Sequence, residues 1–272
     1  MPLEDKFLNH KSNIQQKVRV ATGDNIAIAG AVQERYNQFI ASLVFPANQD
    51  EIPKEAVLRL NEYVDFVKLI ESRHSFFNWR SNFAGSVIPE FFYRYLVSRF
   101  DAIGVRALYS TKESVVEATF SISEAGGIDL RRKDQDLCVG VRLQRLSHGE
   151  NDLPFVAPAA CCEVKTNIDI NKLNGLDFSA ERLKRSFPGA NYFLITETID
   201  FSLDDNYTAG YIDEIFVLRK QVRSVARKTK GPIQADVVKA ATDAIIHGIH
   251  LASRSAGHVY ERLPTGKLIR PS

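Results

Sequence analysis

The chain has 272 residues, with 35 lysines and arginines against 33 aspartates and glutamates, so its formal net charge is +2. Hydrophobic residues make up 44% and charged residues 25%, and these ordinary proportions exclude a disordered or fibrous protein. The longest nearly uncharged run, residues 153–162, is far shorter than the roughly 20 apolar residues that a membrane-spanning helix needs. We therefore expect a globular protein that does not cross a membrane.

The first part of the chain has the apolar spacing of helices. Residues 31–43 and 53–73 repeat apolar side chains every three or four positions, and Pro53 suits the first turn of a helix. Residues 86–99 have the same spacing, with a broad apolar face rich in phenylalanine and tyrosine. Because aromatic side chains need a core to pack on, we expect this third helix to be deeply buried.

From about residue 115 the pattern changes to that of strands. The clearest one is residues 136–143, which alternate and place Leu137, Val139, Val141 and Leu143 on one face. The expected elements are, in chain order, strand 115–122, strand 136–143, strand 155–166, helix 171–187, strand 191–196 and, in a mostly helical remainder from about residue 213, helix 236–251.

This order of elements predicts one α/β domain with helical additions at both ends. No stretch rich in proline, serine or glycine divides the chain into separate domains. Within a single domain of residues 1–272, we expect a helical N-terminal part over about 1–80, a core over about 82–200 and a helical C-terminal part over about 211–272.

The cysteines indicate a reducing compartment. Cys138, Cys161 and Cys162 are odd in number and have no C-x-x-C spacing, so they fit neither a zinc site nor a disulfide framework. They lie in apolar runs, where they are best interpreted as small buried hydrophobic residues. Residues 1–20 carry charges throughout, which predicts no signal peptide. We therefore expect a cytoplasmic protein.

The most informative segment is residues 159–165, Ala-Ala-Cys-Cys-Glu-Val-Lys, at the end of an apolar strand. Because side chains alternate along a strand, Glu163 and Lys165 project from the same face. A carboxylate there can hold a divalent cation, while the lysine positions or deprotonates a water that the cation polarises. The other interpretation is a solvated ion pair on an edge strand, which contributes little to stability.

A magnesium site at Glu163 needs a second carboxylate, because Mg²⁺ prefers hard oxygen ligands. Asp136 is the leading candidate, since it opens the preceding strand and a hairpin would bring it beside Glu163. Asp134 and Asp129 are the competitors, and turn residues of no catalytic role are the simpler interpretation of both.

Asp136 followed by an apolar strand and then Glu163-x-Lys165 resembles the PD-(D/E)xK nuclease motif, although Gln135 stands where the motif has proline. A narrower resemblance, to type II restriction endonucleases of the BbvCI kind, spans roughly residues 75–200. It is carried by residues 86–92, 133–137, 162–167 and 181–188.

The resemblance implies a restriction-endonuclease-like core, a mixed sheet flanked by helices, in a type II restriction endonuclease. It implies Mg²⁺-dependent hydrolysis of double-stranded DNA at a short asymmetric site, by two related subunits that each cut one strand. Asp136 and Glu163 would be the metal ligands, Lys165 the catalytic lysine and Glu90 a helix glutamate that assists the metal site. A first-turn glutamate favoured by the helix dipole is an equally good interpretation of Glu90.

Basic residues supply candidate contacts to the DNA backbone, where each contact adds salt-dependent affinity without sequence information. One group surrounds the Glu-x-Lys strand, and a second lies in a stretch without acidic residues between Arg219 and Lys230; a solvated helix face is the alternative for both. The candidates are Asn167, Lys172, Arg182, Lys184, Arg185, Arg223, Arg227, Lys228 and Lys230.

The sequence favours a restriction endonuclease that works as a homodimer or with a homologous second subunit. Two alternatives stay open: a repair or junction-resolving nuclease on the same core, and a non-catalytic DNA-binding or assembly subunit. The near-neutral charge argues against a protein that coats DNA without specificity.

Overall fold

The structure is a computed structural model and describes residues 3–48, 50–78, 83–104, 106–110, 114–121, 127–148, 151–204, 210–253 and 263–265. Its helices are α1 (Asn9–Val20), α2 (Asn25–Ser42), α3 (Lys54–Arg73), α4 (Val87–Ile103), α5 (Ile170–Ser186), α6 (Arg223–Ala226) and α7 (Ala235–Ser253). Its strands are β1 (Leu108–Ser110), β2 (Ser114–Ser121), β3 (Gly127–Lys133), β4 (Leu137–His148), β5 (Asn151–Asp169), β6 (Asn191–Asp200) and β7 (Glu214–Val217). Short 3-10 helices lie at Asp5–Phe7, Ser75–Phe77, Ala84–Ser86 and Leu263–Thr265. Within these residues no helix has the length and apolar character that a membrane crossing requires.

Five strands form one mixed sheet in the order β1-β4-β5-β6-β7. The pairs β1–β4 and β4–β5 are antiparallel, whereas β5–β6 and β6–β7 are parallel. Because β5 and β6 run in the same direction, the chain must cross over between them, and α5 is that crossover. The carboxyl ends of β5, β6 and β7 therefore meet the amino end of β4 at one edge of the sheet.

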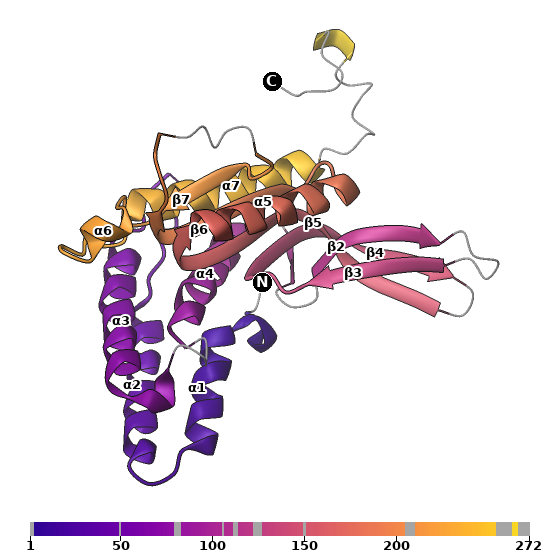
Figure 1. Cartoon of the computed structure of the whole chain (residues 1–272). Helices are drawn as coiled ribbons and strands as arrows, with labels where there is room; N and C mark the ends of the chain where they lie inside the picture. Colours follow the sequence, from indigo (N-terminus) through magenta and orange to yellow (C-terminus); the bar gives the residue numbers. More distant parts are fainter. Residues whose placement is uncertain are drawn as a thin grey trace.

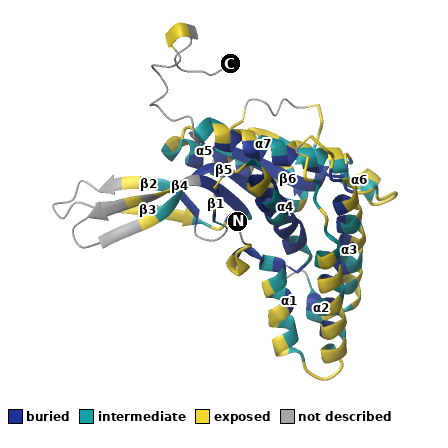
Figure 2. Ribbon diagram, turned by 180° about the vertical axis from the view of Figure 1, so that it is seen from behind, coloured by how far each residue is buried: buried dark blue, intermediate teal, exposed yellow. Residues whose placement is uncertain are grey.

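Helices cover both faces of this sheet (Figures 1 and 2). On one face, Cys161 of β5 and Tyr192 of β6 pack against Leu183 of α5. On the other face, Cys162 and Val164 belong to the main core, which also contains buried residues of α4 and α7. Successive residues of β5 thus point to opposite layers, as the period of two in a strand requires.

The N-terminal helices α1, α2 and α3 lie together beside the sheet, on the side away from the projecting strands β2 and β3 (Figure 1). Buried His10 of α1 joins this helix to α3 and to the segment before α4. Its Nε2 lies 2.8 Å from the Tyr63 hydroxyl of α3, and its Nδ1 lies 2.9 Å from the Ser86 hydroxyl. Complete burial lowers the pKa of His10 to about 3. The imidazole is therefore neutral in the folded chain at neutral pH.

Two hairpins extend from the sheet in the opposite direction (Figure 1). One is the far part of β4 and β5, which pair as far as His148 with Asn151. The other is β2 paired with β3, which forms a separate two-stranded sheet. The strand expected over residues 115–122 is thus confirmed as a strand over 115–121, but it does not enter the main sheet; residue 122 lies outside the described residues.

The expected alternation along β4 holds only over its first part. Leu137 and Val139 are buried, whereas the Leu143 side chain is 50% exposed. The register with β5 shifts on both sides of Gly140, which interrupts the alternation between Val139 and Leu143; the side chain of Val141 lies outside the described residues. Gly140 is required here, since a Cβ atom would lie 2.2 Å from the Ala157 carbonyl oxygen.

Most expected helices and strands are confirmed, with boundaries that move by a few residues. The differences are short or polar elements: α1, β1 and β3 were not expected, and β7 replaces part of the helical segment expected from about residue 213. Residues 31–43 are the later part of a longer helix, α2, which begins at Asn25.

Neutral His10 makes the stability of the fold depend on pH. Folding lowers the pKa of His10 from 6.5 to about 3, so between these two pH values the unfolded chain binds a proton that the folded chain does not. The free energy of unfolding is therefore largest above pH 6.5 and decreases as the pH falls toward 3. Urea unfolding should show a free energy of unfolding about 2 kcal/mol smaller at pH 5 than at pH 7.5 from this group alone. The variant His10→Gln should lack that component; an equal pH dependence in both proteins would contradict the assignment.

Candidate active site

The pairing of β4 with β5 brings the predicted catalytic residues together. Leu137 pairs with Cys162, so Asp136, one residue before β4, lies next to Glu163. Lys165 projects from β5 on the same face as Glu163, one pleat further on. Among the three aspartates considered, Asp136 is the one that the hairpin places at the Glu-x-Lys segment.

The three side chains form a connected cluster. The ammonium nitrogen of Lys165 lies 2.8 Å from Asp136 Oδ2 and 2.7 Å from Glu163 Oε2. The backbone N–H of Val164 also donates to Asp136 Oδ2, at 2.7 Å. The Glu163 side chain is 5% exposed, against 26% for Asp136 and 36% for Lys165. The cluster is thus buried at its Glu163 end and open to solvent at Lys165, which excludes the solvated edge-strand pair.

These contacts shift the three pKa values in different directions. Burial raises the pKa of Asp136, and the charge of Glu163 adds to the rise while Lys165 opposes it. Burial also favours neutral Glu163, but the ammonium groups of Lys165 and Lys133 outweigh it and hold the pKa of Glu163 below its ordinary value. Although burial disfavours the charge on Lys165, the two carboxylates raise its pKa. The folded chain therefore holds Glu163 and Lys165 as ions.

Lys133, at the end of β3, is a fourth member that the sequence analysis missed. Its ammonium nitrogen lies 2.8 Å from Glu163 Oε1, 3.1 Å from the Ser179 hydroxyl of α5 and 3.5 Å from the Tyr192 hydroxyl of β6. Each oxygen of Glu163 thus contacts a different lysine. The one available signal was that Lys133 lies three residues before Asp136.

The donor set fits a hard divalent cation. Asp136 and Glu163 supply carboxylate oxygens at one solvent-accessible edge, and Mg²⁺ is commonly held by one or two carboxylates together with waters and a substrate phosphate. Within the described part of the chain no group of three or more histidine, cysteine, aspartate or glutamate residues could enclose a metal ion. An ion here would depend on water and substrate for its remaining ligands.

Glu90 lies in a different cluster, among the N-terminal helices. Its Oε1 accepts hydrogen bonds from the Tyr36 hydroxyl at 2.6 Å and from Arg94 at 3.0 Å, and its Oε2 accepts one from the backbone N–H of Lys11 at 2.9 Å. It is buried in the first turn of α4. These contacts favour a structural glutamate at this position, and they give no support to the metal-assisting role that the resemblance implied.

The expected DNA contacts near the cluster divide into two kinds. Asn167 follows Lys165 on the same strand and accepts a hydrogen bond from the Thr198 hydroxyl at 3.0 Å, and exposed Lys172 pairs with Asp169 at the start of α5. The basic residues in the later part of α5 instead pair with acidic groups outside the first turn of the helix, with Arg182 on Glu117, Lys184 on Asp213 and Arg185 on Glu181. DNA contact by these five residues stays a prediction.

The basic stretch from Arg219 to Lys230 is mostly irregular, since α6 covers only four residues of it. Arg223 pairs with Asp200, and Lys230 pairs with Asp65 of α3. Arg227 and Lys228 are exposed in the turn after α6. These two are the members of the stretch that a phosphate backbone could reach most easily.

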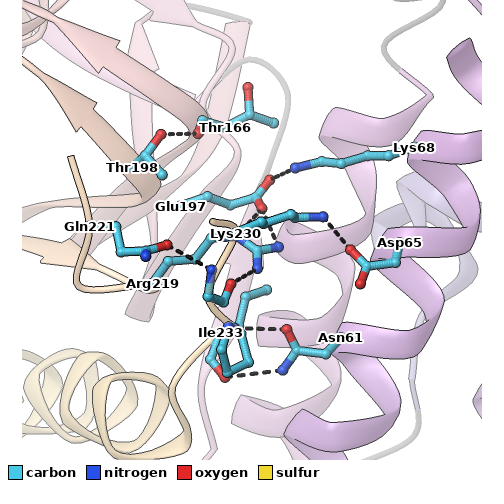
Figure 3. Close-up of polar contacts among 12 residues, drawn as sticks. Asn61, Asp65, Lys68, Thr166, Glu197, Thr198, Arg219, Gln221, Lys230 and Ile233 are labelled. Atoms are coloured by element: carbon cyan, nitrogen blue, oxygen red, sulfur yellow. Dashed lines mark hydrogen bonds and ion pairs between the residues drawn. The ribbon is translucent and has the colours of Figure 1, made fainter. Parts of the chain in front are cut away.

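A second buried ion cluster lies at the same edge of the sheet but on its other face. Glu197 of β6 lies 2.6 Å from the ammonium group of Lys68 in α3 and 2.7 Å from the guanidinium group of Arg219, and both Glu197 and Arg219 are buried (Figure 3). Asn61 of α3 joins the same region by two hydrogen bonds to the backbone of Ile233 (Figure 3). Burial lowers the pKa of Lys68. This cluster binds α3 to the sheet.

Comparisons with known proteins point to one family. A family model described as Bpu10I restriction endonuclease matches residues 83–236, a segment that contains Asp136, Glu163 and Lys165. A solved structure described as the native BbvCI A2B2 tetramer at low resolution is 37% identical in sequence, with a TM-score of 0.72 over 95% of this chain and 100% of that chain. No curated protein matches the chain.

The Glu197 cluster should matter for stability. Replacing Glu197 by glutamine leaves the buried guanidinium of Arg219 without its counter-charge, and breaking such a buried pair costs about 3 kcal/mol. The matched control is Asp65→Asn, because Asp65 is an exposed partner of Lys230 and should cost less than about 1 kcal/mol. Chemical denaturation measures both; similar small losses would show that the buried pair contributes little.

Proposed function

The chain belongs to the Bpu10I restriction endonuclease family and is a subunit of a type II restriction endonuclease, and we propose that Asp136, Glu163 and Lys165 form its DNA-cleaving centre. The observation that carries the proposal is the contact of one lysine with both carboxylates at the edge where β4 begins and β5 ends. These residues lie inside the segment that matches the family. The fold is the mixed sheet flanked by helices of a restriction endonuclease.

In the proposed reaction a water oxygen attacks the phosphorus and gives up a proton to the solvent, the bond between the phosphorus and the 3′ oxygen breaks, and that oxygen leaves with a proton taken from a second water. Mg²⁺, when bound, would polarise the water and neutralise charge on the phosphate. Asp136 and Glu163 would provide its protein oxygen ligands. Lys165, the most exposed of the three, can turn its ammonium group toward the attacking water or a phosphate oxygen, where it orients the one and balances the charge of the other.

The proposed substrate is double-stranded DNA with a short specific sequence. One chain carries one such centre, so cutting both strands takes two chains. The similar solved structure is described as an A2B2 tetramer, which contains two kinds of subunit. We therefore infer that this chain works with a related second subunit; assembly with a copy of itself is the alternative outcome.

We infer that the chain acts as a single domain, because its main core cluster runs from Phe7 to Ile249. A cytoplasmic location, where DNA is available and thiols stay reduced, also fits the cysteines. The sulfur atoms of Cys138 and Cys161 are 3.5 Å apart on paired strands, and both cysteines are free thiols.

The central test is cleavage of supercoiled plasmid DNA with Mg²⁺ by the wild type and by Lys165→Ala. The wild type should give discrete nicked or linear products, alone or with a co-expressed second subunit. The variant should cut at least about a hundredfold more slowly, because charge balance at the phosphate is lost, while it still binds DNA. A chelator should stop the wild-type reaction.

The control is Lys239→Ala, which removes a lysine that pairs with Asp243 on α7, outside the proposed centre. It should cut like the wild type. Equal activity of Lys165→Ala and the wild type would reject the proposed centre. If the wild type cuts no DNA with any second subunit tested, the chain is a non-catalytic subunit. If it cuts branched DNA but not plain duplex DNA, it is a junction nuclease.

The turn after α6 gives a second test of DNA binding. If Arg227 and Lys228 contact phosphates, each alanine variant should weaken DNA binding about equally for all sequences. Each should also reduce the slope of log affinity against log salt by about 1. Binding titrations at several salt concentrations measure this slope. Lys6→Ala, an exposed lysine in the N-terminal segment, is the control that should leave it unchanged.

A further inference from the structure

The second lysine on Glu163 has no place in the cleavage chemistry described above. We propose that Lys133 weakens binding of the divalent cation to the DNA-free enzyme, so that the metal site fills when the scissile phosphate is present. This inference rests on the proposed function, because it takes Asp136 and Glu163 as the metal ligands. It assigns to Lys133 a positioning and charge-balancing role rather than a catalytic one.

The charge of the cluster disfavours an added cation when DNA is absent. Two carboxylates, Asp136 and Glu163, face two ammonium groups, Lys133 and Lys165, so the formal charge of the four is zero. A divalent cation that joins them gains two attractive contacts and two repulsive ones. In a partly buried site these interactions are far stronger than in water, so the repulsion is not screened away. The scissile phosphate adds a further negatively charged ligand, and this attraction offsets the repulsion between the cation and the two lysines.

The ammonium group of Lys133 is held in one place by the protein. Three groups from three elements hold its ammonium: Glu163 of β5 at 2.8 Å, Ser179 of α5 at 3.1 Å and Tyr192 of β6 at 3.5 Å. Among the described residues, Lys165 contacts the two carboxylates and no scaffold hydroxyl, so its ammonium group can turn toward a substrate, whereas Lys133 is tied to the protein scaffold. Its positive charge therefore stays beside Glu163 whether or not DNA is bound.

The two oxygens of the Glu163 carboxylate contact different lysines. Lys133 contacts Oε1, and Lys165, which also contacts Asp136 Oδ2, contacts Oε2. Lys133 thus orients the carboxylate so that Oε2 faces the lysine that it shares with Asp136. This contact sets the direction of the ligand while its charge opposes the cation, and these two effects predict opposite results when Lys133 is removed.

The test is Mn²⁺ binding to the DNA-free full chain, followed by electron paramagnetic resonance, for the wild type, Lys133→Met, Lys133→Arg and the control Lys239→Met. Methionine keeps the unbranched stem of the side chain but removes the ammonium group and its charge, and it should tighten Mn²⁺ binding on the order of tenfold. Arginine keeps the charge and should leave the affinity within about twofold of the wild type, as should the Lys239 control. The Mg²⁺ concentration for half-maximal cleavage should fall for Lys133→Met as well.

Unchanged or weaker Mn²⁺ binding by Lys133→Met would overturn the inference, because orientation of Glu163 would then be the whole role of Lys133. Thermal unfolding of each variant shows whether it is folded. If Lys133→Met does not fold, Lys133→Arg supplies the folded comparison. Mn²⁺ binding by Lys133→Arg that is much tighter than that of the wild type would also overturn the inference. The proposed function fails in a different way, by Lys165→Ala cutting DNA like the wild type.

Discussion

The antiparallel pairing of Leu137 with Cys162 is the constraint on which the proposed centre depends. It fixes the start of β4 opposite Cys162 of β5, and so it brings Asp136 to Glu163 and Lys165. The parallel pairing of β5 with β6 then adds Tyr192, which pairs with Cys161, to the same region. A slip of one residue in either register would turn these polar side chains to the opposite layer of the protein.

Both faces of the sheet carry buried ions at this edge. On the α5 face, Glu163 is satisfied by two lysines, and on the other face Glu197 is satisfied by Lys68 and Arg219 (Figure 3). Burying a charge is costly unless it is paired, so each cluster contains its own counter-charges. The two clusters differ in the exposure of their carboxylates: Asp136 is 26% exposed, whereas Glu197 is 2% exposed. That difference fits the role proposed for the first cluster, whereas the second cluster holds α3 on the sheet.

The sequence was sufficient for the elements and residues whose signal is local. Glu163 and Lys165 share a strand, and Asp136 heads the strand before it, so period and hairpin geometry placed all three. Lys133 was missed because it belongs to a strand of the second sheet, and only the tertiary arrangement brings it to Glu163. For Glu90 the sequence left a metal-assisting role and a structural first-turn glutamate equally open, because its partners Tyr36 and Lys11 come from other helices. Long-range pairing of charged side chains leaves no periodic trace in a sequence.

The lysine bridge between Asp136 and Glu163 means that the centre is a finished part of the fold before any metal arrives. In proteins whose metal site holds the structure together, folding waits for the ion, and a chelator unfolds the chain. Here the chain's own ammonium groups already neutralise the carboxylates. If the centre holds a metal as proposed, the protein can be synthesised, folded and assembled in metal-poor surroundings, and loss of the ion would stop cleavage without unfolding the chain.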